Sequence, residues 1–168
     1  QIQHLMHLLD RKEFISFHRT NPHTNQLEDL FYTHKDSVKL VCAFPNVLCL
    51  DCTYSTNRFN MPFLQIVGVT STQNTFCVAF ACLRNEQQPT YEWALECLRM
   101  IMKNSKTPRV MLTDRDQTLT NAVQNIFPTT NHLFCTFHIS RNVVTHCSPK
   151  VPKAIWAKMY KDWLTLVD

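Results

Sequence analysis

The sequence predicts a mixed α/β domain in which a five-stranded sheet begins as an antiparallel meander, ends in parallel strands and is flanked by helices. Two observations lead to this fold. Two short apolar runs, residues 47–51 and 110–114, each end in a carboxylate, as strands buried on both faces do where they meet solvent. Segments with apolar residues at helical spacing separate the later strands, which is the pattern of parallel crossover connections.

The first part of the chain predicts a helical lead-in and one strand before the central sheet. Loose helical spacing of apolar residues predicts a helix over residues 2–17, and an edge strand is expected over residues 27–33. A short helix should then cover residues 36–44 and stop at Pro45, because proline cannot continue a helix. The first central strand follows and ends in Asp51.

The rest of the chain predicts a hairpin and then alternating helices and strands. Two apolar runs that flank a polar turn at residues 71–74 indicate an antiparallel hairpin. The expected elements are strands at 63–70 and 75–83, a helix at 90–102, the strand ending at 114, a helix at 119–126 and a fifth strand at 131–137. This order is that of the ribonuclease H-like fold, in which the first and fourth strands are neighbours.

The predicted topology brings Asp51 and Asp114 together at one edge of the sheet. Two neighbouring carboxylates repel each other unless a cation lies between them. Pairs of this kind hold divalent metal ions in enzymes that cut or join phosphodiesters. We therefore expect both residues to be catalytic metal ligands.

Composition limits the classes of protein to which the chain can belong. Its 168 residues, 45% of them hydrophobic, suffice for one domain with a real core. A net charge of +4 favours an anionic partner, and no apolar stretch reaches the length of a membrane span. Gly68 is the single glycine, which excludes a nucleotide cofactor bound by a Walker or Rossmann loop. Most of the eight cysteines lie in apolar runs and are expected to be reduced core residues.

Five short motifs follow one another in order and at suitable spacing. They are residues 51–57 with Met61-Pro62, residues 66–70, residues 91–95, residues 112–116 and residues 135–138. Together they resemble the Mutator-like element (MULE) transposases, and the resemblance runs from about residue 27 to about residue 147.

The resemblance implies a DDE-type transposase with a ribonuclease H-like catalytic core that cleaves DNA and transfers strands with Mg²⁺ or Mn²⁺. Asp51 and Asp114 match the first two acids of the family, and Cys135 and His138 match its Cys-x-x-His motif at the active-site edge. The third acid of the family is a downstream glutamate, whereas Glu96 is the last glutamate here. The chain is therefore expected to be a fragment that is inactive alone.

The expected organisation is an N-terminal helix and edge strand at 1–35, the incomplete transposase core at 36–147 and the start of a helical insertion at 148–168. The expected partners are transposon-end and target DNA and a second copy of the chain, with no membrane. The expected location is the nucleus. The alternative function is a domesticated transposase that binds DNA or regulates transcription without catalysis.

A zinc site is a second interpretation of the Cys-x-x-His motif. Cys49 and Cys52 could join Cys135 and His138 in a closed Cys3His centre. Residues three apart in a strand, however, point to opposite faces, and the strand that ends at Asp114 should separate the two pairs. We therefore expect no shared zinc, and a role for Cys135 and His138 in packing and hydrogen bonding around the acids.

Overall fold

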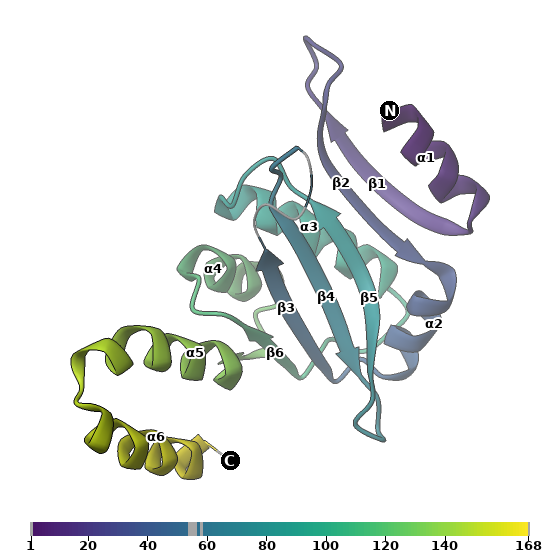
Figure 1. Ribbon diagram of the computed structural model, residues 1–168. Coiled ribbons are helices and arrows are strands. Elements are labelled where there is room, and N and C mark those ends of the chain that lie inside the picture. The colour runs from purple at the N-terminus through teal and green to yellow at the C-terminus, as the bar shows by residue number, and fades with distance from the viewer. Residues whose placement is uncertain (1, 54–56, 58, 168) are drawn as a thin grey trace. The chain divides into compact units, whose positions relative to one another are not determined.

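A seven-stranded mixed sheet dominates the first of the two units into which the chain divides (Figure 1). The computed structural model describes residues 2–53, 57 and 59–167; part of the motif at 51–57 thus lies outside the described residues. The first unit covers residues 1–133 and the second covers residues 134–168. Each is considered by itself.

The first unit contains four helices and the strands of the sheet, the last of which ends at the boundary between the units. In chain order the elements are α1 (Ile2–Arg11), β1 (Phe14–Thr20), β2 (Leu27–His34), α2 (Lys35–Ala43), β3 (Val47–Thr53), β4 (Phe63–Val69), β5 (Thr75–Cys82), α3 (Gln88–Ile101), β6 (Val110–Thr113), α4 (Gln117–Ile126) and β7 (Asn131–Phe134).

The strand order is β1-β2-β5-β4-β3-β6-β7. Within it, β3, β4 and β5 form the antiparallel meander, and β6 pairs with β3 in parallel. The first and fourth strands of the expected fold are therefore neighbours, and the predicted ribonuclease H-like class is confirmed.

The sheet has seven strands instead of the predicted five, because the N-terminal segment adds a hairpin to β5. The predicted helix at 2–17 ends at Arg11, and Phe14–Thr20 forms β1. Aromatic and β-branched residues such as Phe14 and Ile15 favour extended backbone, and pairing with β2 supplies the hydrogen bonds. Strand β2 is consequently internal and not the edge strand that the sequence predicted.

The hairpin is attached to the rest of the unit by the buried carboxylate of Asp29, which is 0% exposed. Its Oδ2 lies 2.9 Å from Nε and 2.8 Å from Nη2 of Arg19, and its Oδ1 accepts from the backbone N–H of Arg84 at 3.0 Å. The Arg19 guanidinium also lies 4.7 Å from the centre of the Trp93 ring on α3. One ion pair thus connects β1, β2, the end of β5 and α3.

The main core lies between the sheet and the helices α3 and α4, which run side by side behind it in Figure 1. Helix α3 buries Tyr91, Ala94, Leu95 and Leu98 on one face, as its helical spacing predicted. It begins at Gln88, two residues before the expected start, with Pro89 in its first turn, where a missing N–H costs nothing. Against this face pack the buried residues of the central strands, among them Leu48, Leu50, Leu64, Ile66 and Met111.

All eight cysteines are free thiols, which agrees with the reduced state expected for most of them, but most are not the core residues that the sequence predicted. Cys97 is buried and Cys77 is exposed, and the remaining six are half-buried. Cys77 is thus not the core residue that its apolar run indicated, because its side chain lies on the solvent side of β5. None of the helices in the described ranges is long and apolar enough to cross a bilayer.

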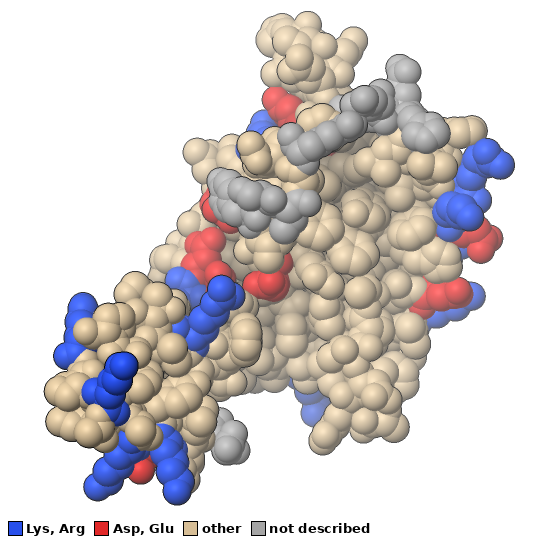
Figure 2. Space-filling view, viewed as in Figure 1, with Lys and Arg blue, Asp and Glu red and all other residues tan. Residues whose placement is uncertain are grey.

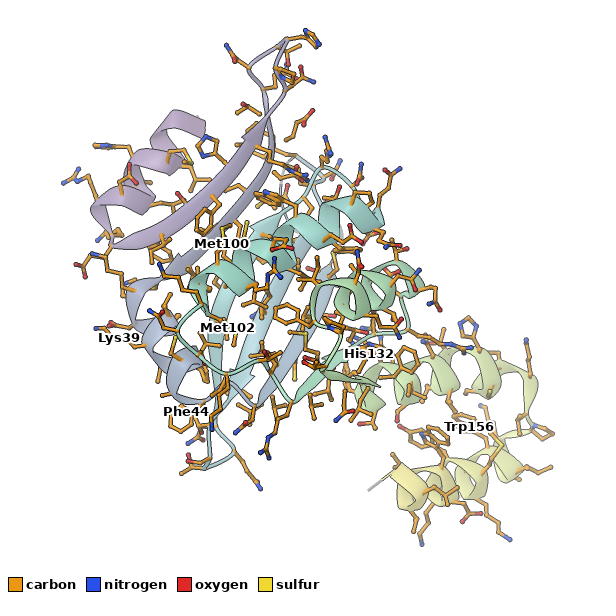
Figure 3. All side chains as sticks on the ribbon, turned by 180° about the vertical axis from the view of Figure 1, so that it is seen from behind. Lys39, Phe44, Met100, Met102, His132 and Trp156 are labelled. Atoms are coloured by element: carbon orange, nitrogen blue, oxygen red, sulfur yellow. The ribbon has the colours of Figure 1, made fainter. Side chains whose placement is uncertain are left out.

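The second unit consists of α5 (Thr136–Cys147), the short 3₁₀ helix η1 (Ser148–Lys150) and α6 (Lys153–Val167). The two long helices contact each other through the indole of Trp163, whose Nε1 donates to Oγ of Ser140 at 3.0 Å. Trp156 lies between α5 and α6 (Figure 3) and stacks on Tyr160 with ring centres 5.4 Å apart.

Replacing Asp29 with alanine should lower the free energy of unfolding by about 2–4 kcal/mol, because Arg19 and the Arg84 N–H lose a buried charged acceptor. Urea denaturation measures this. The matched control is Asp36→Ala, since Asp36 forms an exposed ion pair with Lys39 and its loss should change stability little. Equal effects of the two substitutions would show that the hairpin is not held by Asp29.

The single glycine of the chain leaves space for the aromatic ring of the residue opposite it on the neighbouring strand. A Cβ added at Gly68 would lie 2.4 Å from Cζ of Phe76, its partner on β5. Gly68→Ala should therefore lower the free energy of unfolding by about 1–3 kcal/mol through overpacking. In a Phe76→Ala background the same change should cost little, because no ring remains to be displaced. A double-mutant cycle without such coupling would contradict this explanation.

Candidate active site

Asp51 and Asp114 lie at the same level on neighbouring parallel strands. The register pairs Val47 with Val110, Leu48 with Met111 and Cys49 with Leu112. Two residues further on, β3 carries Asp51, and Asp114 directly follows β6. Continuing the register thus aligns the two carboxylates at one edge of the sheet. Both residues are half-buried, and Oδ1 of Asp114 is buried.

The backbone at Asp114 is held by a hydrogen-bonded threonine. Thr113, on β6, is 0% exposed, and its hydroxyl donates to the carbonyl oxygen of Asp114 at 2.7 Å. The same Oγ1 lies 2.8 Å from Nε2 of His132 on β7, which Figure 3 labels. Burial lowers the pKa of His132, so the imidazole that faces Thr113 is kept neutral. This contact ties the carboxylate-bearing end of β6 to β7.

Tyr91 of α3 connects the ends of the two acid-bearing strands. The phenol is 0% exposed, and its hydroxyl lies 3.4 Å from Oδ2 of Asp116. It also forms a hydrogen bond with the thiol of Cys52, the residue after Asp51. Asp116 in turn caps α4, with its Oδ1 accepting from the N–H of Thr118 at 2.7 Å.

Burial keeps the thiol and the phenol of this region protonated. The pKa of Cys52 is raised to about 12, mainly by burial. The hydrogen bond with Tyr91 lowers this pKa, and the nearby carboxylates of Glu86 and Asp114 raise it. Burial likewise raises the pKa of Tyr91. A protonated thiol is a poor nucleophile.

The donor chemistry of the two aspartates fits a hard divalent cation. Mg²⁺ and Mn²⁺ prefer carboxylate oxygens, and Mg²⁺ commonly takes one or two protein carboxylates with water and substrate phosphate as its other ligands. Asp51 and Asp114 can supply such a pair. In the described ranges, no group of three or more His, Cys, Asp or Glu side chains is arranged to hold a metal ion.

Cys135 and His138 belong to the second unit, whereas Cys49 and Cys52 belong to the first. Cys135 is the residue before α5, and His138 lies in the first turn of that helix with Nδ1 buried. The strand predicted at 131–137 ends at Phe134, and α5 begins at Thr136. Their role at the active-site edge stays a prediction.

Sequence reasoning found the two aspartates but not their supporting residues. His132 and Glu86 carry no periodic or motif signal, because their contacts join elements distant in the sequence. Thr113 lies in the motif at residues 112–116, but that motif did not indicate its contact with His132. Tyr91 was part of a recognised motif, but its place among the apolar residues of α3 indicated only core packing.

The strand order and the parallel pairing of β3 with β6 define a fold of the ribonuclease H-like class. The family model of the MULE transposase domain matches residues 47–142, more than half of the chain. The chain belongs to this family, and the resemblance inferred from its motifs is confirmed. The match begins at the first residue of β3, so that α1, the β1–β2 hairpin and α2 lie outside it.

Curated relatives and a solved structure share limited identity with the chain. It is 22% identical over 150 residues to Protein FAR1-RELATED SEQUENCE 2 of Arabidopsis thaliana. This match covers 89% of the chain and 18% of the relative. It is 26% identical over 123 residues to Protein FAR-RED IMPAIRED RESPONSE 1 of the same plant, covering 73% and 15%. The chain thus spans less than a fifth of these relatives.

Among solved structures, the chain is similar to the HTLV-2 integrase catalytic core domain in complex with magnesium, in its trimeric form. The TM-score is 0.33 and the sequence identity 13%, and the match covers 64% of this chain and 74% of the other.

Thr113→Val should lower the free energy of unfolding by about 1–3 kcal/mol, because the half-buried His132 ring and the Asp114 carbonyl lose their common partner. Thr113→Ser keeps the hydroxyl and should retain the contacts. Urea denaturation gives the stability, and the ring resonances of His132 in NMR spectra report on the contact. A ring signal that moves equally in both variants would exclude a specific role for the hydroxyl.

Proposed function

We propose that this chain is the ribonuclease H-like core of a transposase-derived protein that binds DNA and acts as a DNA-binding or transcription-regulating module. The observation that carries the proposal is its similarity to FAR1-related proteins, one of which is named for an impaired response to far-red light. Such a name describes a response of the organism and not the movement of DNA.

Duplex DNA is the proposed partner, and the nucleus the proposed location. Membership in the MULE transposase domain family supports DNA as the ligand. The net charge of +4 acts in the same direction, because phosphate contacts supply most of the affinity in sequence-independent DNA binding.

A second candidate function is metal-dependent DNA cleavage and strand transfer by a DDE-type transposase. The alignment of Asp51 with Asp114 on β3 and β6 favours it. In this function the two carboxylates would hold Mg²⁺ or Mn²⁺, which supplies a Lewis acid and an activated water or DNA hydroxyl. A third carboxylate from elsewhere in the parent protein would complete the ligand set.

Incubation of the chain with a labelled DNA duplex in Mg²⁺, in Mn²⁺ or in EDTA separates the two functions. A binding module should bind the duplex with or without the metal and leave it intact. Asp51→Asn and Asp114→Asn should then bind as well as the wild type or better, since each removes a negative charge. Fluorescence anisotropy measures binding, and denaturing gels detect nicks.

Asp36→Asn is the control. This substitution removes the same charge, but from an exposed aspartate on α2. Metal-dependent cleavage that each of Asp51→Asn and Asp114→Asn abolishes, and that Asp36→Asn retains, would establish the catalytic function instead. Failure of the wild-type chain to bind any duplex would refute the DNA-binding module.

A further inference from the structure

The second unit carries most of the net positive charge of the protein. It holds five of the 17 lysines and arginines but two of the 13 aspartates and glutamates, so that +3 of the net +4 resides in 35 residues. All five cations are exposed, and Figure 2 shows Lys and Arg side chains standing out from this unit. They are Arg141, Lys150, Lys153, Lys158 and Lys161.

Among the described residues, these cations have no acidic partner. In the part of the chain that the structure describes, none of the five forms an ion pair, whereas the first unit pairs Arg19 with Asp29, Lys39 with Asp36 and Arg99 with Glu96. Unpaired lysines keep their full charge available for an external anion.

Three of the lysines share one side of α6. The half-buried aromatic residues of this helix, Trp156, Tyr160 and Trp163, recur at the spacing of one helical face and contact α5 through Trp163. Beside this face, Lys153, Lys158 and Lys161 alternate with small exposed residues. We call this surface the basic face of α6; it consists of Lys153, Ala154, Ala157, Lys158, Lys161 and Thr165.

Small residues between the lysines allow an extended anion to approach the helix closely. Ala154 and Ala157 lie one turn from Lys158 and Lys161, and the exposed Leu164 lies one turn beyond Lys161 at the end of this face. Lysine is a compact point charge that binds phosphate without a fixed hydrogen-bonding geometry. Such a surface suits a regular array of phosphates and does not read base edges.

We propose that the basic face of α6 binds the phosphate backbone of duplex DNA, independently of its sequence. The inference rests on the proposed DNA-binding function and assigns it to a surface. About three phosphates are neutralised, one by each lysine, and the corresponding counterions are released on binding.

An anionic membrane is the competing partner, since lysines beside apolar residues also occur on helices that lie on bilayers. Ile155 and Leu166 are 59% and 81% exposed. They are separated from Lys158 by Asp162, however, and the aromatic residues of α6 that could enter a bilayer are half-buried in the unit. The arrangement therefore favours DNA.

The test measures the salt dependence of binding by the whole chain to a labelled 20-base-pair duplex, between 50 and 200 mM NaCl. The variant Lys153→Gln/Lys158→Gln/Lys161→Gln should bind more weakly at low salt. Its slope of log affinity against log salt should be smaller in magnitude by about 2.7, three contacts at 0.9 each. Over this range the wild-type affinity should fall by about 40-fold more than that of the variant.

The matched control is Lys12→Gln/Lys103→Gln/Lys106→Gln, which removes three exposed charges from the first unit and should keep the wild-type slope. Arginine at the three α6 positions should also keep it. The α6 variant and the first-unit control could lose affinity and salt dependence equally, or neither could lose any. Either result would refute DNA binding by the basic face of α6 but leave DNA binding by the chain standing. A wild-type chain that binds phosphatidylserine vesicles but no duplex would overturn both proposals. Circular dichroism verifies folding of each variant.

Discussion

The parallel pairing of β3 with β6 is the constraint on which the rest of the structure depends. Strand β3 is central, with β4 antiparallel on one side and β6 parallel on the other. Its Leu48 is fully buried, as is Met111 opposite it on β6, so a shift of register by one residue would turn these side chains toward the wrong face of the sheet. The hydrophobic core thus fixes the register, and the register aligns Asp51 with Asp114.

The sequence predicts those parts of the fold in which the local pattern and the final environment agree. Strands β3 and β6 are apolar runs, as the sequence indicated, but their residues alternate between buried and half-buried, so only one face of each strand is fully buried and not both as predicted. Helix α3 repeats its apolar residues at helical spacing because one of its faces packs in the core. Strand β1 could not be recognised, because its short apolar stretch fits a helix as well as a strand. Its extended form depends on pairing with β2 and on the ion pair of Arg19 with Asp29.

In the candidate site too, the sequence predicts what depends on the local pattern and misses what depends on contacts between distant elements. The aspartates could be located because they terminate recognisable strands, whereas their environment comes from side chains on other elements. Tyr91 is an example, since one hydroxyl joins Cys52 of β3 to Asp116 beyond β6. Burial holds Tyr91 and Cys52 in their neutral forms, so the charge that an approaching ligand meets at this edge comes from the carboxylates.

The N-terminal hairpin also determines what the sheet exposes. Strand β2 pairs with β5 through Leu30, Phe31 and Tyr32, and it occupies the outer backbone groups of β5 at residues 80–82. The sequence of β5, Thr75–Cys82, is apolar and uncharged, and an open edge of that composition is a template for intermolecular strand pairing. Although the family match begins only at residue 47, a recombinant domain trimmed to that match would therefore tend to aggregate.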